Sequence, residues 1–469
     1  MILKHTDIEI PAEEPFKNCK LNRKGYAVAL TSIVDSYADG FVLSLNNPWG
    51  TGKSTFIKMW KTHLENSQYT TLYFNAWEND FDADPMVALM SELGSLTDQK
   101  TDETFNSLIR KAAVISHSVI PGLLKAIAAK YVDTEVLGNL LTDAGKGASD
   151  LLRDEIIDYT KKKNGLVDFK AELEKYIKEH TNGKPLVLFI DELDRCRPSY
   201  AVELLEQVKH FFSVSGIVFV LSIDKAQLGN AIRGFYGSEQ INSTEYLRRF
   251  IDLEFILPEP PANVFVEYLY NYFSFDEYFR HVDRNNNELS HDKEEFIKYS
   301  NVLFTFNSLT LRQQEKMFSH ARVALRTFGT RNYIFPSVFI FLIFLKDFHS
   351  ELYKKLVLRK VTPQIILDDL SKVIPTNIFK DNQHIYIIVE AILIKLYYNY
   401  YSEINYEAKI YEKDEARNTK LLIKPYTDSS EGFKNFINII DHFNSRNGGD
   451  VKLSHLLNKI NLLDNFQNL

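Results

Sequence analysis

A glycine-rich segment that ends in lysine and serine is the part of this chain with the clearest capacity for chemistry. The sequence FVLSLNNPWGTGKSTF, residues 41–56, places an apolar run before a loop and a helical pattern after it. Gly50 and Gly52 let successive N–H groups face a phosphate, while Lys53 can reach the outer phosphates and the Ser54 hydroxyl can ligate Mg²⁺. We therefore expect the nucleotide to contact Asn47, Pro48, Trp49, Gly50, Thr51, Gly52, Lys53, Ser54 and Thr55.

One position departs from the usual G-x-x-x-x-G-K-[ST] pattern, because Asn47 stands where the first glycine is expected. Asparagine is one of the few other residues that enter left-handed backbone conformations at low cost. We therefore expect Asn47 to replace that glycine through its backbone conformation.

The segment KPLVLFIDELDRCRP, residues 184–198, carries the acidic residues that such a loop needs. An apolar strand ends at Asp191, whose carboxylate is expected to hold Mg²⁺ through water, together with the serine hydroxyl of the loop. Glu192 is placed to polarise an attacking water, and we assign catalysis to it and to Lys53. Asp194 is better explained as an acidic cap of the next helix.

Aromatic and sulfur-containing side chains near these motifs have simpler explanations. We expect Trp77 to pack in the core and Trp49 to support the loop, because packing is the common fate of tryptophan. Cys196 is expected to be a small buried residue.

The elements that must position these residues alternate between strands and helices in the first half of the chain. Short apolar runs separated by helical patterns predict a parallel sheet covered on both faces. The expected strands are 41–45, 71–74, 186–190, 217–223 and 251–256, and the clearest helices are 55–65 and 200–212.

The chain is expected to comprise three regions. Residues 1–260 form an α/β domain with a helical insertion at about 93–166, within which 161–165 is expected to be a solvated turn. Prolines at 258, 260 and 261 mark its end, and no strand is expected beyond them. Residues 261–360 form a helical, lid-like region and 361–469 a helical C-terminal region.

Net charge, cysteine count and apolar segments indicate which partners and which cellular compartment to expect. The 469 residues include 55 basic and 62 acidic side chains, a formal net charge of −7, which does not favour general attraction to nucleic acid or anionic lipid. Two cysteines are too few for a disulfide framework, and we expect a cytoplasmic protein. The apolar segment 112–131 is interrupted by polar residues and 334–345 is short, so neither is expected to span a membrane.

Five segments together resemble the KAP family of P-loop NTPases. They are NNPWGTGKST, FNAWEND at 74–80, DELDRCRP at 191–198, YLRRFIDLEFILPEP at 246–260 and LIFLKDFHSELYKKL at 342–356. The resemblance implies a five-stranded sheet of order 5-1-4-3-2. It also implies bacterial defence against phage or membrane-associated signalling as the setting. Family members often carry membrane helices between the first and third motifs, but here that interval contains only the interrupted apolar segment 112–131. The chain therefore resembles the soluble, defence-related members.

That strand order implies further candidates around the phosphates. Ser222 and Asp224, at the tip of the fourth strand, are expected between the lysine loop and Asp191, where they could sense the γ-phosphate or simply cap a helix. Related ATPases place an arginine before the fifth strand to complete a neighbour's site, which implies oligomers and points to Arg249 rather than Arg248. Arg312 is a weaker candidate for a second sensor.

The sequence leaves several functions to compare. The first is an ATP- or GTP-dependent switch that controls self-assembly, or binding of a protein partner through the C-terminal helical region. The second is a nucleotide-binding scaffold with negligible hydrolysis, against which the intact Lys53, Asp191 and Glu192 count. The third is a nucleic-acid motor, for which we find no helicase motif set and no strongly basic groove, so nucleic-acid binding stays open.

Overall fold

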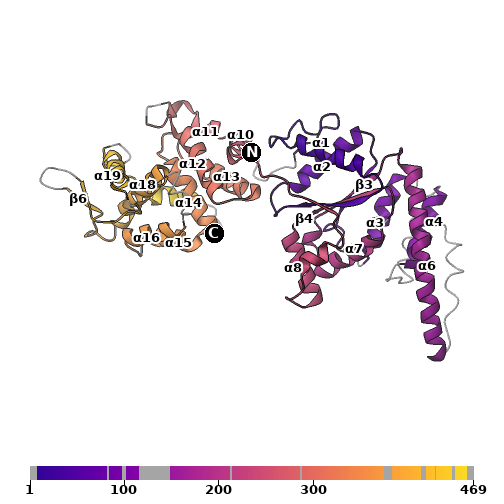
Figure 1. Cartoon of the computed structure of the whole chain (residues 1–469). Helices are drawn as coiled ribbons and strands as arrows, with labels where there is room; N and C mark the ends of the chain where they lie inside the picture. Colours follow the sequence, from indigo (N-terminus) through magenta and orange to yellow (C-terminus); the bar gives the residue numbers. More distant parts are fainter. Residues whose placement is uncertain are drawn as a thin grey trace. The chain divides into compact units, whose positions relative to one another are not determined.

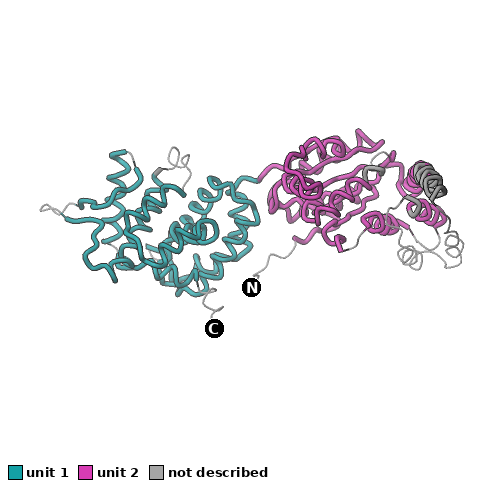
Figure 2. The backbone as a smooth tube through the Cα atoms, turned by 90° about the horizontal axis from the view of Figure 1, so that it is seen from below, with its two compact units in different colours: residues 1–6, 260–469 teal, residues 7–259 magenta. Residues whose placement is uncertain are grey.

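The computed structural model describes residues 8–81, 84–97, 102–115, 148–211, 214–285, 288–373, 383–413, 419–427, 429–445 and 449–461. The chain forms two compact units, which Figure 2 colours separately and which meet in sequence between Glu259 and Pro260. The first unit along the chain, residues 7–259 and magenta in Figure 2, carries the predicted phosphate loop, and the second unit is the teal part that begins at Pro260. Most of segment 112–131 lies outside the described residues.

Five parallel strands form the sheet of the first unit, in the order β2-β3-β4-β1-β5, which confirms the expected order. Parallel pairing brings the carboxyl ends of the strands to one edge, where ligands of open α/β sheets bind. The observed β5 is shorter than predicted because it pairs with β1 through only three residues. The strands are β1 (Phe41–Asn46), β2 (Thr71–Asn75), β3 (Leu186–Asp191), β4 (Ile217–Ile223) and β5 (Leu253–Phe255).

Helices cover both faces of this sheet (Figure 1). Along β3, Val187 and Phe189 join the core under α1 and α2, whereas Leu188 and Ile190 join the core under α3, α7 and α8. Strands buried on both faces must be apolar throughout, which explains the continuous runs in the sequence. The helices are α1 (Lys24–Ser36), α2 (Lys53–Asn66), α3 (Pro85–Leu93), η1 (Gly94–Leu96), α4 (Glu103–Ile115), α6 (Ala148–His180), η3 (Leu193–Arg195), α7 (Pro198–Phe211), α8 (Lys225–Tyr236) and α9 (Ser243–Leu247).

The helix α6 runs without interruption through residues 161–165, so the predicted solvated turn is wrong. One glycine inside a helix costs only about 1 kcal/mol relative to alanine, and packing can offset that cost. The later part of α6 packs against α4, where Nζ of Lys111 lies 2.5 Å from a carboxylate oxygen of Glu172. This packing favours a continuous helix over a local turn.

The second unit is mostly helical but contains one antiparallel strand pair, so the expectation of no further strand is wrong. Each strand has three residues, too few to produce a recognisable alternation of polar and apolar side chains. The elements are α10 (Ala262–Tyr272), α11 (Asp276–Phe279), η4 (Val282–Arg284), α12 (Asp292–Phe306), α13 (Leu311–Leu325), α14 (Pro336–Phe348), α15 (Ser350–Leu358), α16 (Pro363–Val373), α18 (Gln383–Tyr401), β6 (Tyr411–Lys413), β7 (Thr419–Leu421), α19 (Ser430–Asn444) and α20 (Ser454–Ile460).

The apolar run 334–345 lies in the core of the second unit. Every residue of α14 from Pro336 to Leu345 is buried. A helix that is apolar on all sides belongs either in a protein core or in a membrane. Across the described ranges, no helix combines the length and the apolar character needed to cross a membrane.

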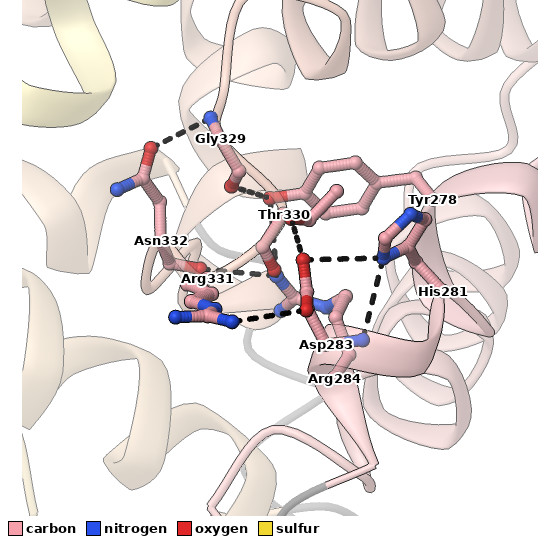
Figure 3. Close-up of polar contacts among 8 residues, drawn as sticks. All are labelled: Tyr278, His281, Asp283, Arg284, Gly329, Thr330, Arg331 and Asn332. Atoms are coloured by element: carbon pink, nitrogen blue, oxygen red, sulfur yellow. Dashed lines mark hydrogen bonds and ion pairs between the residues drawn. The ribbon is translucent and has the colours of Figure 1, made fainter.

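A fully buried arginine, Arg284, joins η4 to the loop 329–332 (Figure 3). Its Nη1 donates hydrogen bonds to the carbonyl oxygens of Thr330 at 2.8 Å and Asn332 at 3.1 Å. Its Nη2 pairs with Asp292. Burial raises the pKa of Asp292 to about 6, an effect that the guanidinium only partly offsets. The loop is therefore held through its backbone by one buried cation.

Candidate nucleotide-binding site

The loop between β1 and α2 has the backbone that phosphate binding requires. Gly50 and Gly52 have φ values of 83° and 80°, in the left-handed region that favours glycine. Gly52 immediately precedes α2, so the N-terminal end of that helix, which carries unpaired N–H groups and a positive dipole, faces the loop. The Thr51 hydroxyl braces the turn by donating to the carbonyl of Pro48 at 2.9 Å. Ser54 and Thr55 follow in the first turn of the helix.

Asn47 does not replace the missing glycine in the way we expected. Its φ is not positive, so its contribution is not a left-handed backbone. Instead its buried amide forms two hydrogen bonds with the backbone of Leu257: Nδ2 donates to the carbonyl and Oδ1 accepts from the N–H, both at 2.8 Å. A glycine could not make this link. Asn47 thus fastens the start of the loop to the segment that follows β5.

Lys53 is folded onto the loop that precedes it. Its Nζ donates to the carbonyl oxygen of Pro48 at 3.2 Å and to that of Asn47, and the residue is only 8% exposed. Burial lowers the pKa of the ammonium, while the carboxylates of Asp194, Asp224 and Asp191 oppose that effect. The ammonium is therefore held at the loop among carboxylates.

Arg23 is a second cation at the loop, and the sequence pattern did not reveal it. Its guanidinium donates to the carbonyl of Thr51 at 2.8 Å and to that of Gly52 at 3.1 Å, and the residue is 4% exposed. Burial lowers the pKa of Arg23 to about 10. Because both acceptors are carbonyls, Arg23 braces the loop without using its N–H groups.

Asp191 ends β3 with a buried and well-oriented carboxylate. The residue is 1% exposed; Oδ2 accepts a hydrogen bond from the Tyr73 hydroxyl at 2.9 Å, and Oδ1 accepts from the N–H of Glu192 at 3.0 Å. Burial and the adjacent carboxylate raise the pKa of Tyr73, which keeps its hydroxyl a donor. Tyr73 is a further residue that the sequence analysis missed, because a tyrosine within a strand is usually only a packing residue.

Glu192 has a positive φ of 60°, unusual for a residue with a side chain. Conformations of this kind cluster at functional sites, where the surrounding structure maintains them. Oε1 of Glu192 lies 2.7 Å from Nη1 of Arg195, and the Asn75 side chain also forms a hydrogen bond with the carboxylate. Burial raises the pKa of Glu192, and both partners oppose that rise. The predicted base is therefore positioned, but it is already paired.

Asp194 is not a helix cap but a link between the two motifs. Its carboxylate accepts a hydrogen bond from the indole N–H of Trp49. Burial raises the pKa of Asp194, while Trp49 and Lys53 lower it. The indole therefore supports the loop, in agreement with the expectation for Trp49. Trp77, by contrast, is 54% exposed, so its assignment to the core is wrong.

The two polar residues at the tip of β4 differ in their surroundings. Asp224 is the N-cap of α8, where its Oδ1 accepts hydrogen bonds from the N–H groups of Ala226 and Gln227. Ser222 is paired in register with Asp191, and its buried hydroxyl has no hydrogen-bond partner among the described residues. Asp224 is thus explained by capping, whereas the hydroxyl of Ser222 is buried beside Asp191 without a hydrogen-bond partner in the described part of the chain.

Neither Arg248 nor Arg249 contacts the phosphate loop in the described part of the first unit. Arg248 is exposed and pairs with Glu245 one turn earlier, at 2.5 Å. Arg249 is exposed in the turn before β5. Arg312 is exposed on α13 in the second unit. All three arginines remain candidates to act on nucleotide.

The oxygen ligands near the loop fit a Mg²⁺ ion that arrives with a nucleotide. Magnesium at phosphate sites keeps several waters and takes only one or two protein oxygens, which Asp191 and Ser54 would supply. Within the described ranges, no group of three or more His, Cys, Asp or Glu side chains could hold a metal by itself. The buried carboxylate of Asp191 suits a hard cation, and the remaining ligands would be phosphates and water.

Comparisons with known proteins agree with this geometry. The family described as the KAP family P-loop domain matches residues 23–331. An uncharacterised protein of Methanocaldococcus jannaschii is 29% identical over 175 residues, which cover 33% of this chain and 89% of that protein.

Two solved structures also align with the chain. The ORC2 protein of Aeropyrum pernix, in ADPNP–ADP complexes, aligns at 14% identity and a TM-score of 0.27, covering 90% of this chain and 94% of that one. Cdc6p of Pyrobaculum aerophilum aligns at 11% identity and a TM-score of 0.31, covering 98% and 88%.

Proposed function

From the premise that this chain belongs to the KAP family of P-loop domains, we propose that it is a switch that binds and hydrolyses a nucleoside triphosphate, ATP or GTP. One observation carries the proposal. The ammonium of Lys53 is held at a glycine loop with left-handed turns, within the electrostatic field of the buried carboxylates that follow β3 and β4. That arrangement provides cationic and N–H donors for phosphates beside an acidic group for water.

Each part of the site has one role in this proposal. The N–H groups of the loop and the ammonium of Lys53 hold the β- and γ-phosphates. Asp191 and Ser54 hold Mg²⁺, which supplies charge neutralisation at the phosphate oxygens when it is bound. Glu192 orients the attacking water and accepts its proton. Positioning and charge stabilisation are most of what phosphoryl transfer requires from a protein.

The wider role follows the family. We propose that nucleotide state controls self-assembly, with Arg249 completing the site of a neighbouring copy, or binding of a protein partner through the helical second unit. Defence against phage is the setting that the resemblance suggests. The pairing of Glu192 with Arg195 favours, as a second candidate, a scaffold that binds nucleotide and turns it over slowly.

Hydrolysis and assembly measured together test the proposal. The purified protein is incubated with ATP, GTP or no nucleotide in the presence of Mg²⁺, and phosphate release and molecular mass are recorded. The Lys53→Ala variant should lose nucleotide binding, because the ammonium and the loop jointly hold the phosphates. The Glu192→Gln variant should bind normally and hydrolyse at least about 10²-fold more slowly. Wild-type binding by a folded Lys53→Ala variant would refute the site, and normal turnover by Glu192→Gln would place the base elsewhere.

A further inference from the structure

The guanidinium of Arg195 is a cation beside the proposed base that no role above uses. It lies 2.7 Å from Glu192, and the two side chains are mostly buried, with exposed fractions of 25% and 15%. The short helix η3 brings them together, because residues three apart face the same side of a helical turn. In this arrangement the negative charge of the Glu192 carboxylate is balanced by the guanidinium, and the oxygen in contact with Arg195 is not free to take a proton from water.

Arg195 also acts electrostatically on Lys53, the residue that is expected to hold the outer phosphates. It is one of the charged groups whose field reaches the ammonium of Lys53, and it lowers the pKa of that group. The ring of Trp77 is a further neighbour, with the guanidinium carbon 5.7 Å from the ring centroid. The guanidinium is thus held by non-covalent contacts with a carboxylate and an aromatic face.

We propose that Arg195 is a catalytic arginine of its own subunit, which exchanges Glu192 for the γ-phosphate when a nucleoside triphosphate binds. The inference rests on the proposed function of the site. A terminal phosphate carries more negative charge than a carboxylate and offers three acceptor oxygens, so it competes for a guanidinium that can bind two of them at once. The exchange links ligand binding to release of the base.

The same movement serves the reaction twice. Once released, Glu192 can accept the proton of the attacking water. As the bond from the water oxygen to the γ-phosphorus forms, the bond to the bridging oxygen breaks, and the nucleoside diphosphate leaves with the electron pair. Arg195 then stabilises the charge on the transferring group, a contribution worth about 10³–10⁵ in rate for arginines in related reactions. Without nucleotide, the same arginine holds the base inactive.

Transition-state binding separates this role from a structural one. Steady-state hydrolysis of ATP is measured for Arg195→Ala, Arg195→Lys and the control Arg197→Ala, together with affinities for ATP and for ADP with aluminium fluoride and Mg²⁺. Arg197 is a suitable control because it lies two residues further on and pairs with Asp80 instead. We expect Arg195→Ala to lose at least about 10³-fold in kcat with ATP affinity changed less than about threefold. Affinity for the fluoride complex should fall at least about 10²-fold, Arg195→Lys should recover part of both losses, and Arg197→Ala should match the wild type.

Several results would overturn the inference. A kcat that rises in Arg195→Ala would show that the arginine only restrains Glu192, and unchanged affinity for the fluoride complex would show that it does not reach the phosphate. Activity restored by mixing Arg195→Ala with Lys53→Ala subunits would place the arginine in a neighbour's site. The fluoride measurement decides the matter even if wild-type turnover is slow. If the wild type binds no nucleotide, the proposed function itself fails, which is a distinguishable result.

Discussion

Replacing Asn47 by glycine should destabilise the first unit, although it restores the residue that phosphate loops usually have at this position. The structure gives the reason, because the Asn47 amide supplies both hydrogen bonds to the backbone of Leu257, at 2.8 Å each. Leu257 is 2% exposed and Asn47 is 4% exposed, so water does not readily replace these bonds. A glycine would leave one buried N–H and one buried carbonyl without partners.

The magnitude follows from the cost of those two groups. A buried backbone group that loses its partner costs about 1–3 kcal/mol, and the added freedom of glycine in the unfolded chain costs about 0.5–1 kcal/mol more. Partial entry of water into the vacated space offsets some of the loss. We therefore expect Asn47→Gly to lower the free energy of unfolding of the first unit by about 2–4 kcal/mol. Asn47→Asp should also be destabilising, because a carboxylate cannot donate to the Leu257 carbonyl.

Tryptophan fluorescence gives the assay. All three tryptophans, Trp49, Trp60 and Trp77, lie in the first unit, so their emission during urea unfolding reports on that unit. Asn18→Gly is the matched control, because the Asn18 amide makes a hydrogen bond in an exposed setting, and losing that bond together with the added freedom of glycine should cost only about 0.5–1.5 kcal/mol. An Asn47→Gly protein as stable as the wild type, or no less stable than the Asn18→Gly control, would refute the reasoning.

Further predictions concern the second unit and the assembly. Burial raises the pKa of Glu390 from 4.5 to about 7. Unfolding therefore releases a proton between these two pH values, and the free energy of unfolding falls as the pH rises through that window. The Glu390→Gln variant should lose up to about 3 kcal/mol of this pH dependence, which unfolding followed by circular dichroism at pH 5 and pH 8 would show. Arg284→Met should lower the free energy of unfolding by about 3–5 kcal/mol. The loss should be larger at pH 8 than at pH 5, because at pH 8 Asp292 is ionised without its partner. Adding Asp292→Leu to this variant should recover part of the lost stability. If Arg249 acts on a neighbour's nucleotide, specific activity should rise with protein concentration, and mixing Arg249→Ala with Lys53→Ala subunits should restore activity. A specific activity that does not change with protein concentration, together with an inactive mixture, would argue against that role.

The sheet and the central motifs could be predicted because their signals are local. Strands buried on both faces must be continuously apolar, and Gly50, Gly52 and Lys53 lie within one short segment whose geometry is nearly fixed by its residue types. The same is true of Asp191, which ends an apolar strand. In each case consecutive residues are enough to identify the strand or the motif.

The rest depended on residues that meet only in the folded chain. Arg23 reaches the loop from 28 residues away, and Asn47 reaches Leu257 across 210 residues, so no local pattern contains either contact. The role of Asn47 was misjudged because backbone preference was considered and side-chain hydrogen bonding was not. The pairing of Arg195 with Glu192 was within one helical turn, but only the observed η3 shows that the two side chains face each other.

The span of 210 residues between Asn47 and Leu257 also sets an order of events during synthesis of the chain. The contacts of Arg23 with the loop need only the 28 or 29 residues that follow Arg23 in the chain, so these contacts can form early in synthesis. At roughly 5–20 residues per second, the ribosome needs about 10–40 s more to deliver Leu257. During that interval the start of the loop lacks its anchor, so a nascent chain should acquire stable nucleotide binding only after β5 and the segment behind it have emerged.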